Sequence, residues 1–354
     1  MRTKLIYLAL TVMLFTSCEE YYKPDLDVVP ELLVVESHVT NDPKQNFVRL
    51  SKTRSFYSTS EEEKIIDAKV ELIDTSGETT KGNEVTSGYF TFSKLPIPGR
   101  KYFIRITHGK DIYESAQVYM PPLPAIDTLY TKHKIEKTYR TDAFGAPEQL
   151  ELSGREIYID APTNPQLKYY RFSWRAVLQW IYSPTEYSEI PPPSVYGWKS
   201  FYDNDLFNIA GPKEFSTSDK VQQHPILWRA YNNKEYLDSL TQTGNGWILI
   251  IDQYGISKAS YDFHEKLNRQ LAAEGSLFDP LLTQIYGNIK CVSNPSKIAL
   301  GFFDLNSYRQ HRYFLGLGYS EKSVVTQRRL NQYPDIPDNG YQTENPPPFW
   351  INYY

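Results

Sequence analysis

The clearest pattern in this chain is a short-range alternation of apolar and polar residues, which is typical of half-buried β-strands. In the segment Lys101–Thr107, Tyr102, Ile104 and Ile106 alternate with polar side chains. Residues two apart in a strand share one face, so this segment predicts a strand with one buried side. Similar patterns predict five further strands before residue 120, at Leu32–Thr40, Phe47–Ser51, Lys69–Asp74, Gly88–Phe92 and Ile112–Val118.

Turn-forming residues separate these predicted strands. They are Asn41-Asp42-Pro43, Ser76-Gly77, Lys81-Gly82-Asn83, Pro98-Gly99 and Gly109-Lys110. Short strands at this spacing predict an Ig-like or transthyretin-like β-sandwich over residues 31–122. Pro121, Pro122 and Pro124 follow, and prolines cannot continue a central strand. We therefore expect a domain boundary at residues 122–126.

Residues 126–354 are expected to form a second, larger β-rich domain. Its clearest strand is Tyr170–Trp180, where large apolar residues at even positions alternate with Arg171, Ser173 and Arg175. This alternation predicts one strongly apolar face and one polar face. Later strands are predicted at Ile157–Ile159, Trp247–Gln253, Lys297–Asp304 and Arg312–Tyr319.

One amphipathic helix is predicted in this second domain, over residues 258–274. Phe263, Leu267 and Leu271 recur at steps of four and form one apolar stripe. Glu265 and Arg269 are spaced for an i,i+4 ion pair on the helix surface. A single helix on a sheet makes the fold class mainly β.

A proline-rich, aromatic-rich connection is predicted from Ser183 to about Asp205. It carries the candidate ligand- or partner-binding residues Tyr187, Tyr196, Trp198 and Tyr202. Prolines reduce the entropic cost of holding a loop in one shape, and exposed aromatic rings are common at recognition surfaces. The alternative is that these rings cover the core of their own domain, and the sequence leaves both possibilities open.

The N-terminus has the pattern of a secretory signal peptide. Arg2 and Lys4 precede an apolar run of about 11 residues that ends at Phe15, which is too short to span a bilayer. Cys18 stands at the expected cleavage site, as in a bacterial lipoprotein signal, although Phe15 occupies the position where such signals usually have Leu. We expect residues 1–17 to be removed, Cys18 to carry lipid, and residues 18–30 to be a tether.

The charge balance excludes nucleic acid as the expected partner. The chain has 38 basic and 42 acidic side chains. Removing the first 17 residues takes two of the basic ones and leaves 36 against 42, a net charge of about −6. No basic field is left to attract phosphates. Tyrosine is abundant, with 29 residues beside 17 Phe and 6 Trp, which agrees with a strand-rich fold.

No catalytic or cofactor-binding pattern is recognisable in the sequence. The six histidines lie too far apart in sequence for a helical zinc pair, and we expect each to be structural or at the surface. Neither a nucleophile elbow nor a phosphate-binding loop occurs. Asp203-Asn204-Asp205 does not continue as a calcium loop, and Cys291 has no activating base nearby in sequence. The expectation is a protein that is not an enzyme and has no metal or cofactor.

Several ordered motifs resemble one family of lipoproteins. They are Glu31-Leu32-Leu33-Val34-Val35-Glu36, Val39-Thr40-Asn41-Asp42-Pro43, Pro98-Gly99-Arg100-Lys101-Tyr102, Gly275-Ser276-Leu277-Phe278-Asp279-Pro280, Gly287-Asn288-Ile289-Lys290-Cys291-Val292 and Leu300-Gly301-Phe302-Phe303. Their order resembles the domain of unknown function 4249 family of Bacteroidota outer-membrane lipoproteins. The resemblance implies an accessory role beside a TonB-dependent transporter, and it implies no catalytic residues.

Three hypotheses for function follow. The first is a non-enzymatic binding subunit, anchored in the outer membrane by lipid and working with a TonB-dependent β-barrel transporter in nutrient uptake. The second is a structural subunit of a larger outer-membrane complex. The third, disfavoured by the absence of a catalytic pattern, is a glycan or peptide hydrolase. Glu19 and Glu20 resemble signals that send such lipoproteins to the cell surface, so periplasmic and surface orientations both stay open.

Overall fold

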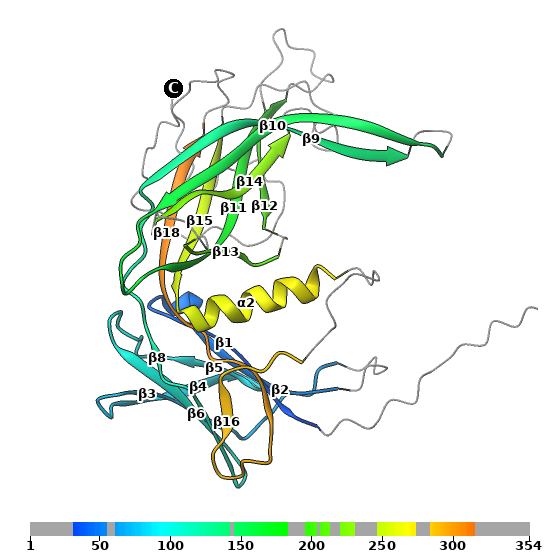
Figure 1. Cartoon of the computed structure of the whole chain (residues 1–354). Coiled ribbons are helices and arrows are strands. Elements are labelled where there is room, and N and C mark those ends of the chain that lie inside the picture. Colours follow the sequence, from blue (N-terminus) through cyan, green and yellow to red (C-terminus); the bar gives the residue numbers. More distant parts are fainter. Residues whose placement is uncertain are drawn as a thin grey trace, which may run out of the picture.

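The protein is described from a computed structural model over residues 31–54, 61–141, 145–182, 195–203, 206–212, 220–230, 246–273 and 284–315. Within these ranges it is mainly β, with one α-helix and one short 3-10 helix (Figure 1). This confirms the expected fold class. None of the helical segments in these ranges is long and apolar enough to cross a bilayer.

The first half of the chain contains the six predicted strands with small changes. The strands are β1 (Leu33–Thr40), β2 (Phe47–Lys52), β3 (Lys69–Asp74), β4 (Thr79–Thr86), β5 (Tyr89–Phe92), β6 (Lys101–His108), β7 (Asp111–Ser115) and β8 (Val118–Tyr119), with the 3-10 helix η1 (Pro43–Gln45) after β1. The turn predicted at Lys81-Gly82-Asn83 is wrong. These residues lie inside β4, where Gly82 pairs with Phe92 and the missing side chain leaves room for Val70.

The second half contains longer strands than the sequence pattern predicted. They are β9 (Thr128–Thr141), β10 (Pro147–Ala161), β11 (Tyr169–Tyr182), β12 (Val195–Tyr202), β13 (Asn208–Ala210), β14 (Val221–Ala230), β15 (Gly246–Ile256), β16 (Ile289–Cys291), β17 (Ala299–Phe302) and β18 (Leu305–Leu315). Strands β9, β12, β13, β14 and β16 were not predicted. Part of the predicted strand Arg312–Tyr319 lies beyond the described residues.

Strand β1 joins the two halves of the molecule. On one edge it pairs antiparallel with β2, and on the other it pairs parallel with β17 and then with β18. The result is one continuous hydrogen-bonded path in the order β12-β11-β15-β18-β1-β2-β5-β4-β3-β6-β7-β16. A separate three-stranded sheet has the order β14-β10-β9. A self-standing sandwich is therefore not confirmed, and the division into two domains stays a prediction.

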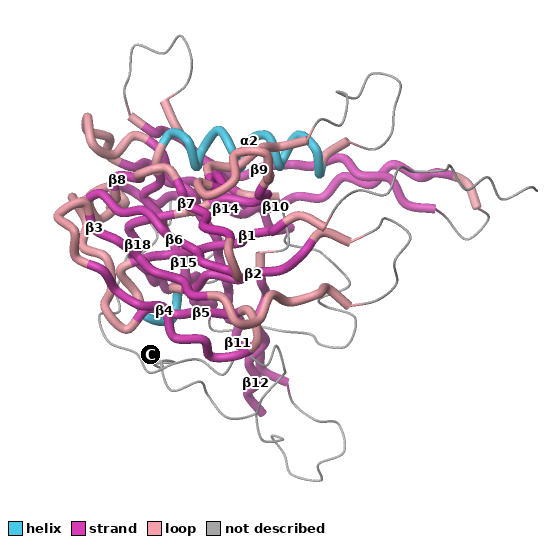
Figure 2. The backbone as a smooth tube through the Cα atoms, turned by 90° about the horizontal axis from the view of Figure 1, so that it is seen from below, coloured by secondary structure: helices cyan, strands magenta, loops and turns pink. Residues whose placement is uncertain are grey.

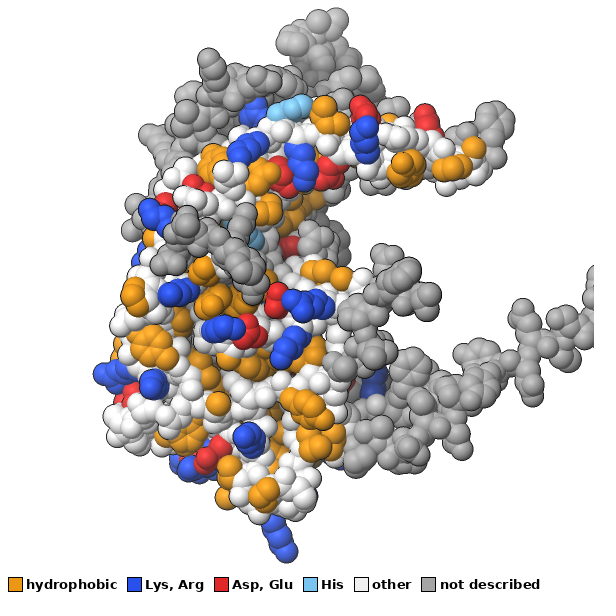
Figure 3. Space-filling model, viewed as in Figure 1, with side chains coloured by type: hydrophobic (Ala, Val, Ile, Leu, Met, Phe, Trp, Pro, Cys, Tyr) orange, Lys and Arg blue, Asp and Glu red, His pale blue; other side chains and the backbone are white. Residues whose placement is uncertain are grey.

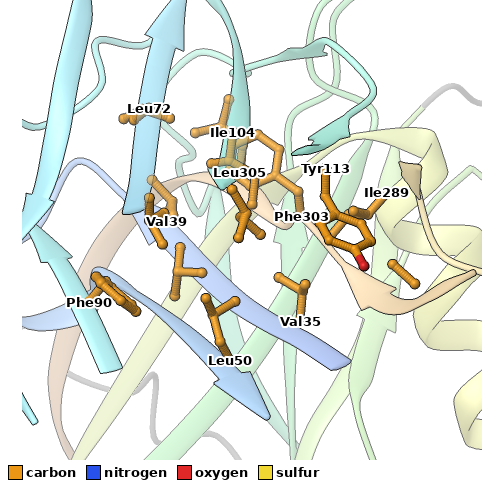
Figure 4. Close-up of a cluster of buried hydrophobic side chains, with 14 of the residues drawn as sticks. Val35, Val39, Leu50, Leu72, Phe90, Ile104, Tyr113, Ile289, Phe303 and Leu305 are labelled. Carbon is orange, nitrogen blue, oxygen red and sulfur yellow. The ribbon is translucent and has the colours of Figure 1, made fainter. Parts of the chain in front are cut away.

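The larger apolar core lies among the N-terminal strands and is completed by the C-terminal part of the chain. Figure 4 shows Val35, Leu50 and Ile104 packing around Phe303 and Leu305. All five side chains are almost fully removed from water. Because residues 289–305 supply part of this core, the N-terminal strands do not bury their apolar faces by themselves.

A second core lies between strand β11 and the three-stranded sheet. Tyr170 and Phe172 on β11 pack with Ile157 and Ile159 on β10 and with Leu249 on β15. This confirms the predicted apolar face over residues 170–176; the side chains of Leu178 and Trp180 lie outside the described part of the chain. The polar face of β11, with Arg171 and Ser173, turns toward the helix.

Helix α2 (Lys258–Leu271) packs against β11 and β13, at the level between the upper and the lower strands in Figure 1. Ser257 caps it by accepting a hydrogen bond from the Ser260 backbone N–H. Glu265 and Arg269 form the predicted ion pair, at 3.1 Å. The predicted stripe is partly wrong, since Leu271 is 63% exposed and His264 is the more deeply buried residue. Phe263 does pack inward, with its ring stacked on Phe302.

A close backbone approach holds β17 against β1. Gly301 has a φ of +95°, and a Cβ atom there would lie 1.8 Å from the Val35 carbonyl oxygen. A Cβ atom on Gly287 would lie 1.4 Å from the Gly301 carbonyl oxygen. Glycine is required at both positions because neighbouring backbone occupies the space that a side chain needs.

Replacing Gly301 with alanine is expected to lower the free energy of unfolding by about 3 kcal/mol or more, because strain and a backbone clash combine. Gly99→Ala is the matched control, since Gly99 has a φ of +91° but no atom within 4 Å of the added Cβ. The control should lose about 1–2 kcal/mol, the cost of the left-handed conformation alone. Urea unfolding measures both, and equal losses would contradict the close approach of β17 to β1.

Candidate functional site

A cleft of about 600 Å³ opens where β1, β11, helix α2 and the segment before β18 meet. Most of its wall is apolar. Its apolar lining includes Val34, Phe47, Leu206, Phe207, Phe263 and Leu267. Such a concave, largely apolar surface with a few polar groups is typical of a small-molecule site.

Four polar side chains meet at the base of this cleft. They are His38 from β1, Arg171 from β11, His264 from α2 and Asp304 from the turn between β17 and β18. The two histidines and the carboxylate are all less than 9% exposed. Buried ionisable groups are costly unless they are paired, so their mutual contacts decide their charge states.

Arg171 lies between the two histidines and donates to both. Its Nη2 is 3.0 Å from His38 Nδ1, and its Nη1 is 3.4 Å from His264 Nε2. A guanidinium has no acceptor, so each histidine nitrogen facing it must be unprotonated. His264 Nδ1 donates to the Ser260 carbonyl oxygen at 2.8 Å. His264 is therefore the neutral Nδ1–H tautomer, and His38 is the neutral Nε2–H tautomer.

The electrostatics agree with these tautomers. Burial lowers the pKa of both His38 and His264, and the positive charge of Arg171 acts in the same direction, against the opposing effect of Asp304. For Asp304, burial alone would raise the pKa, but its polar contacts with His38, His264 and Arg171, of which Arg171 carries the positive charge, hold that pKa well below its usual range. The cluster thus holds one cation and one anion.

Asp304 is fixed from several directions. Ser260 Oγ donates to its Oδ1 at 2.6 Å, and its Oδ2 lies 3.9–4.0 Å from a nitrogen of each of the three basic side chains. Its backbone N–H donates to Ser37 Oγ at 2.9 Å. The carboxylate therefore links the turn before β18 to both β1 and the helix.

Arg171 lies at the centre of this cluster. Its guanidinium contacts both histidines and stacks over the Tyr254 ring, with Cζ 4.5 Å from the ring centroid. Within the described residues, no group of three or more His, Cys, Asp or Glu side chains is arranged to hold a metal ion. The positive charge beside Asp304 is that of Arg171, whose Nη1 lies 4.0 Å from Asp304 Oδ2.

The residue types Ser260, His264 and Asp304 match a catalytic triad, but their contacts do not. In a triad the histidine accepts from the serine hydroxyl and donates to the carboxylate. Here the Ser260 hydroxyl donates to Asp304, and His264 donates to a backbone carbonyl. Ser260 is also only 1% exposed. No activated nucleophile results from this arrangement.

The residues singled out from the sequence lie elsewhere. Tyr196 and Trp198 lie on strand β12, opposite Ile181 and Gln179 of β11, so the predicted connection over residues 183–205 is wrong at this point. Cys18 and Tyr187 fall outside the described residues. A strand forms there because β11 extends to Tyr182 and offers an edge for residues 195–202.

Tyr202, at the end of β12, is the predicted residue nearest the cleft, because the following residue, Asp203, lines it. The Tyr202 hydroxyl is buried without a hydrogen-bond partner among the described residues. Its neighbour Phe201 packs against the second core. At least one ring of the aromatic segment thus covers the protein's own core, which was the alternative left open from the sequence.

The four residues at the base of the cleft were not predicted as a site. They stand at positions 38, 171, 264 and 304, on separate elements, and the histidines were expected to be structural or at the surface. The one available signal was Arg171 on the polar face of a strand whose other face is strongly apolar. A charged residue in such a strand indicates that the polar face of the strand also packs against another part of the protein.

Comparison with known protein families identifies the chain. The profile described as domain of unknown function (DUF4249) matches residues 19–312, so the chain belongs to this family. This confirms the family inferred from the ordered motifs, while the lipoprotein nature and the Bacteroidota origin stay predictions. No curated protein and no solved structure matches the chain.

Removing the Asp304 charge is expected to destabilise the protein strongly. Asp304→Asn leaves Arg171 as an uncompensated buried cation, which should lower the free energy of unfolding by about 3–5 kcal/mol. Glu265→Gln is the matched control, because it breaks an exposed ion pair with Arg269 and should cost about 0.5 kcal/mol or less. Urea unfolding compares them. Similar small losses would contradict the proposed charge states.

The neutral histidines also predict a pH dependence. Both have a folded-state pKa below 6.5, so the unfolded chain binds more protons as the pH falls through that value. The free energy of unfolding should therefore be unaffected by these histidines above pH 6.5. As the pH falls below 6.5, it should decrease by up to about 1.4 kcal/mol per pH unit for each histidine. Asp304, with its lowered pKa, contributes a loss only at pH values below about 4.

Urea unfolding between pH 5 and pH 7.5 measures this slope. His38→Gln keeps an acceptor for Arg171 but cannot titrate. The pH dependence of its unfolding free energy should therefore be weaker by up to about 1.4 kcal/mol per pH unit, the contribution of one histidine. An unchanged slope in this variant would show that His38 is not held neutral.

Proposed function

We propose that this DUF4249 protein is a lipid-anchored, non-enzymatic binding subunit of the outer membrane of a Bacteroidota bacterium, working with a TonB-dependent transporter in nutrient uptake. The observation that supports the binding role is the cleft, whose polar side chains at the bottom are held by contacts with one another. Arg171 engages both histidines and Ser260 engages the carboxylate, so no group there is poised as a base or nucleophile. A rigid site of this kind can bind without reacting.

The chemistry of the cleft indicates an uncharged and largely apolar ligand. Arg171 and Asp304 compensate each other, so a charged ligand would gain no net partner from them at the base of the site. His38 lines the cleft and, because its Nδ1 accepts from Arg171, carries its proton on Nε2. A ligand carbonyl, hydroxyl or ether oxygen can accept a hydrogen bond from Nε2 while its apolar part packs on Phe47, Phe207 and Phe263.

The anchor is the second part of the proposal. The signal pattern of residues 1–17, with lipid on Cys18 and a tether over residues 18–30, would hold the protein at the membrane. Confinement there raises the effective concentration of the subunit beside its transporter. In the same proposal the N-terminal strands make an Ig-like or transthyretin-like sandwich, and Tyr187, Tyr196, Trp198 and Tyr202 contribute partner or ligand contacts.

A structural subunit that binds no small ligand is the second candidate. The long hairpin of β9 and β10 favours it, because this hairpin reaches away from both cores (Figure 1). The two candidates share the anchor and the membrane partner and differ in whether the cleft is used.

The test is affinity isolation of the protein from gently solubilised membranes. A TonB-dependent barrel protein in stoichiometric amount is expected with the native chain. Cys18→Ala should fold normally, leave the membrane fraction and lose function in cells, because only its anchor is removed. Full cellular activity of this released variant would contradict the anchoring role, and the absence of any barrel protein would contradict the partnership.

A further inference from the structure

The hairpin of β9 and β10 reaches well beyond the sheet that supports it. The two strands pair continuously from Thr128 opposite Asp160 to Thr141 opposite Pro147. The third strand, β14, pairs with β10 only over residues 154–161. Residues 135–141 and 147–153, here called the arm, are therefore a two-stranded ribbon. It projects from the body in both Figure 1 and Figure 2.

The arm exposes apolar side chains that a monomer does not need to expose. Ile135 is 54% and Tyr139 is 71% exposed, and apolar and charged side chains lie together along the arm in Figure 3. Leu150 and Leu152 are only half-buried. Two-stranded ribbons are marginally stable in water at best, because each strand has a partner on one side only.

One edge of the arm is open. Among the described residues β9 is hydrogen-bonded to β10 alone, so alternate backbone N–H and C=O groups point outward along the other edge. Lysines often guard such edges, but here Lys134 pairs with Glu156 at 2.8 Å and with Glu136 at 3.0 Å. Lys137 pairs with Glu151 at 3.2 Å. Lys132, on β9 before the arm, donates to Gln223. Lys137 is the one lysine of β9 within the arm, and because its charge is already matched it adds little repulsion against an incoming strand.

We propose that β9 pairs antiparallel with β9 of a second copy of this chain, centred on Ile135. A twofold axis perpendicular to a sheet must place one residue opposite its own copy, because facing side chains point to the same side. Near the midpoint of β9, three residues could lie opposite their own copies: Lys134, Ile135 and Glu136. Lys134 would face a second lysine and Glu136 a second glutamate, and like charges directly opposite are destabilising. Ile135 faces the partner's Ile135.

The neighbouring pairs support this register. Lys134 lies opposite the partner's Glu136, and Glu136 opposite the partner's Lys134, so two oppositely charged pairs flank the isoleucines. Thr131 lies opposite the partner's Tyr139, which gives that exposed ring a neighbour. The two bodies stand at opposite ends of the paired strands. The ribbon becomes the centre of a six-stranded sheet, and this inference depends on neither the ligand nor the anchor.

Cysteine cross-linking of the full chain tests the register. Ile135→Cys places two thiols on directly facing residues, where Cα atoms are about 4.5–5.5 Å apart and a disulfide can form. Lys137→Cys is the matched control, since it lies on the same face of the same strand but four residues from its own copy in this register. Mild oxidation should cross-link most of the Ile135→Cys protein, little of the control and none of the parent chain.

Light scattering after gel filtration gives the second measurement. The parent chain should have twice the mass of one chain, and Ile135→Lys, which sets two lysines face to face, should have the mass of one. A parent chain that is monomeric up to about 100 µM would overturn the proposal, as would equal cross-linking at positions 135 and 137. If the parent chain is a monomer and Ile135→Lys abolishes its association with the membrane partner, the open edge of β9 binds that partner and not a second copy.

Discussion

The contact on which the rest of the structure depends is the buried guanidinium of Arg171 between His38, His264 and Asp304. These four side chains come from β11, β1, helix α2 and the turn before β18. A buried ion pair stabilises a fold weakly compared with apolar packing, but removing one partner is costly. We therefore expect the cluster to act mainly on conformational specificity, by allowing one arrangement of the four elements that apolar contacts alone would hold less uniquely.

The two cores are joined by the same elements that carry the cluster. Strand β1 pairs with β2 of the first half and with β17 and β18 of the second, and Ser37 Oγ donates to the Phe302 carbonyl oxygen. Gly301 lets β17 approach the β1 backbone closely, which places Asp304 beside His38. Packing of the first core and charge pairing at the base of the cleft thus depend on one another.

Local pattern predicted much of this fold and almost none of its site. Period-two alternation located β6 and β11 because one face of each is buried in its own core. It failed for β4, where Lys81-Gly82-Asn83 read as a turn although exposure of both strand faces permits such residues. It also failed for β12, which forms because the preceding strand β11 extends to Tyr182 and offers it an edge, and not because residues 195–202 alternate. The helix was located correctly, but its buried face is set by Asp304, 40 residues beyond His264, and no local period contains that contact.

The account of the cleft depends on the protonation states of two histidines, and these can be observed directly. Nitrogen-15 NMR of the imidazole rings near pH 7 distinguishes the two neutral tautomers from each other and from imidazolium. We expect His38 as the Nε2–H tautomer and His264 as the Nδ1–H tautomer, each set by the Arg171 donor on its other nitrogen. An imidazolium at either position, or the opposite tautomer, would contradict the arrangement in which Arg171 is the cation of this site.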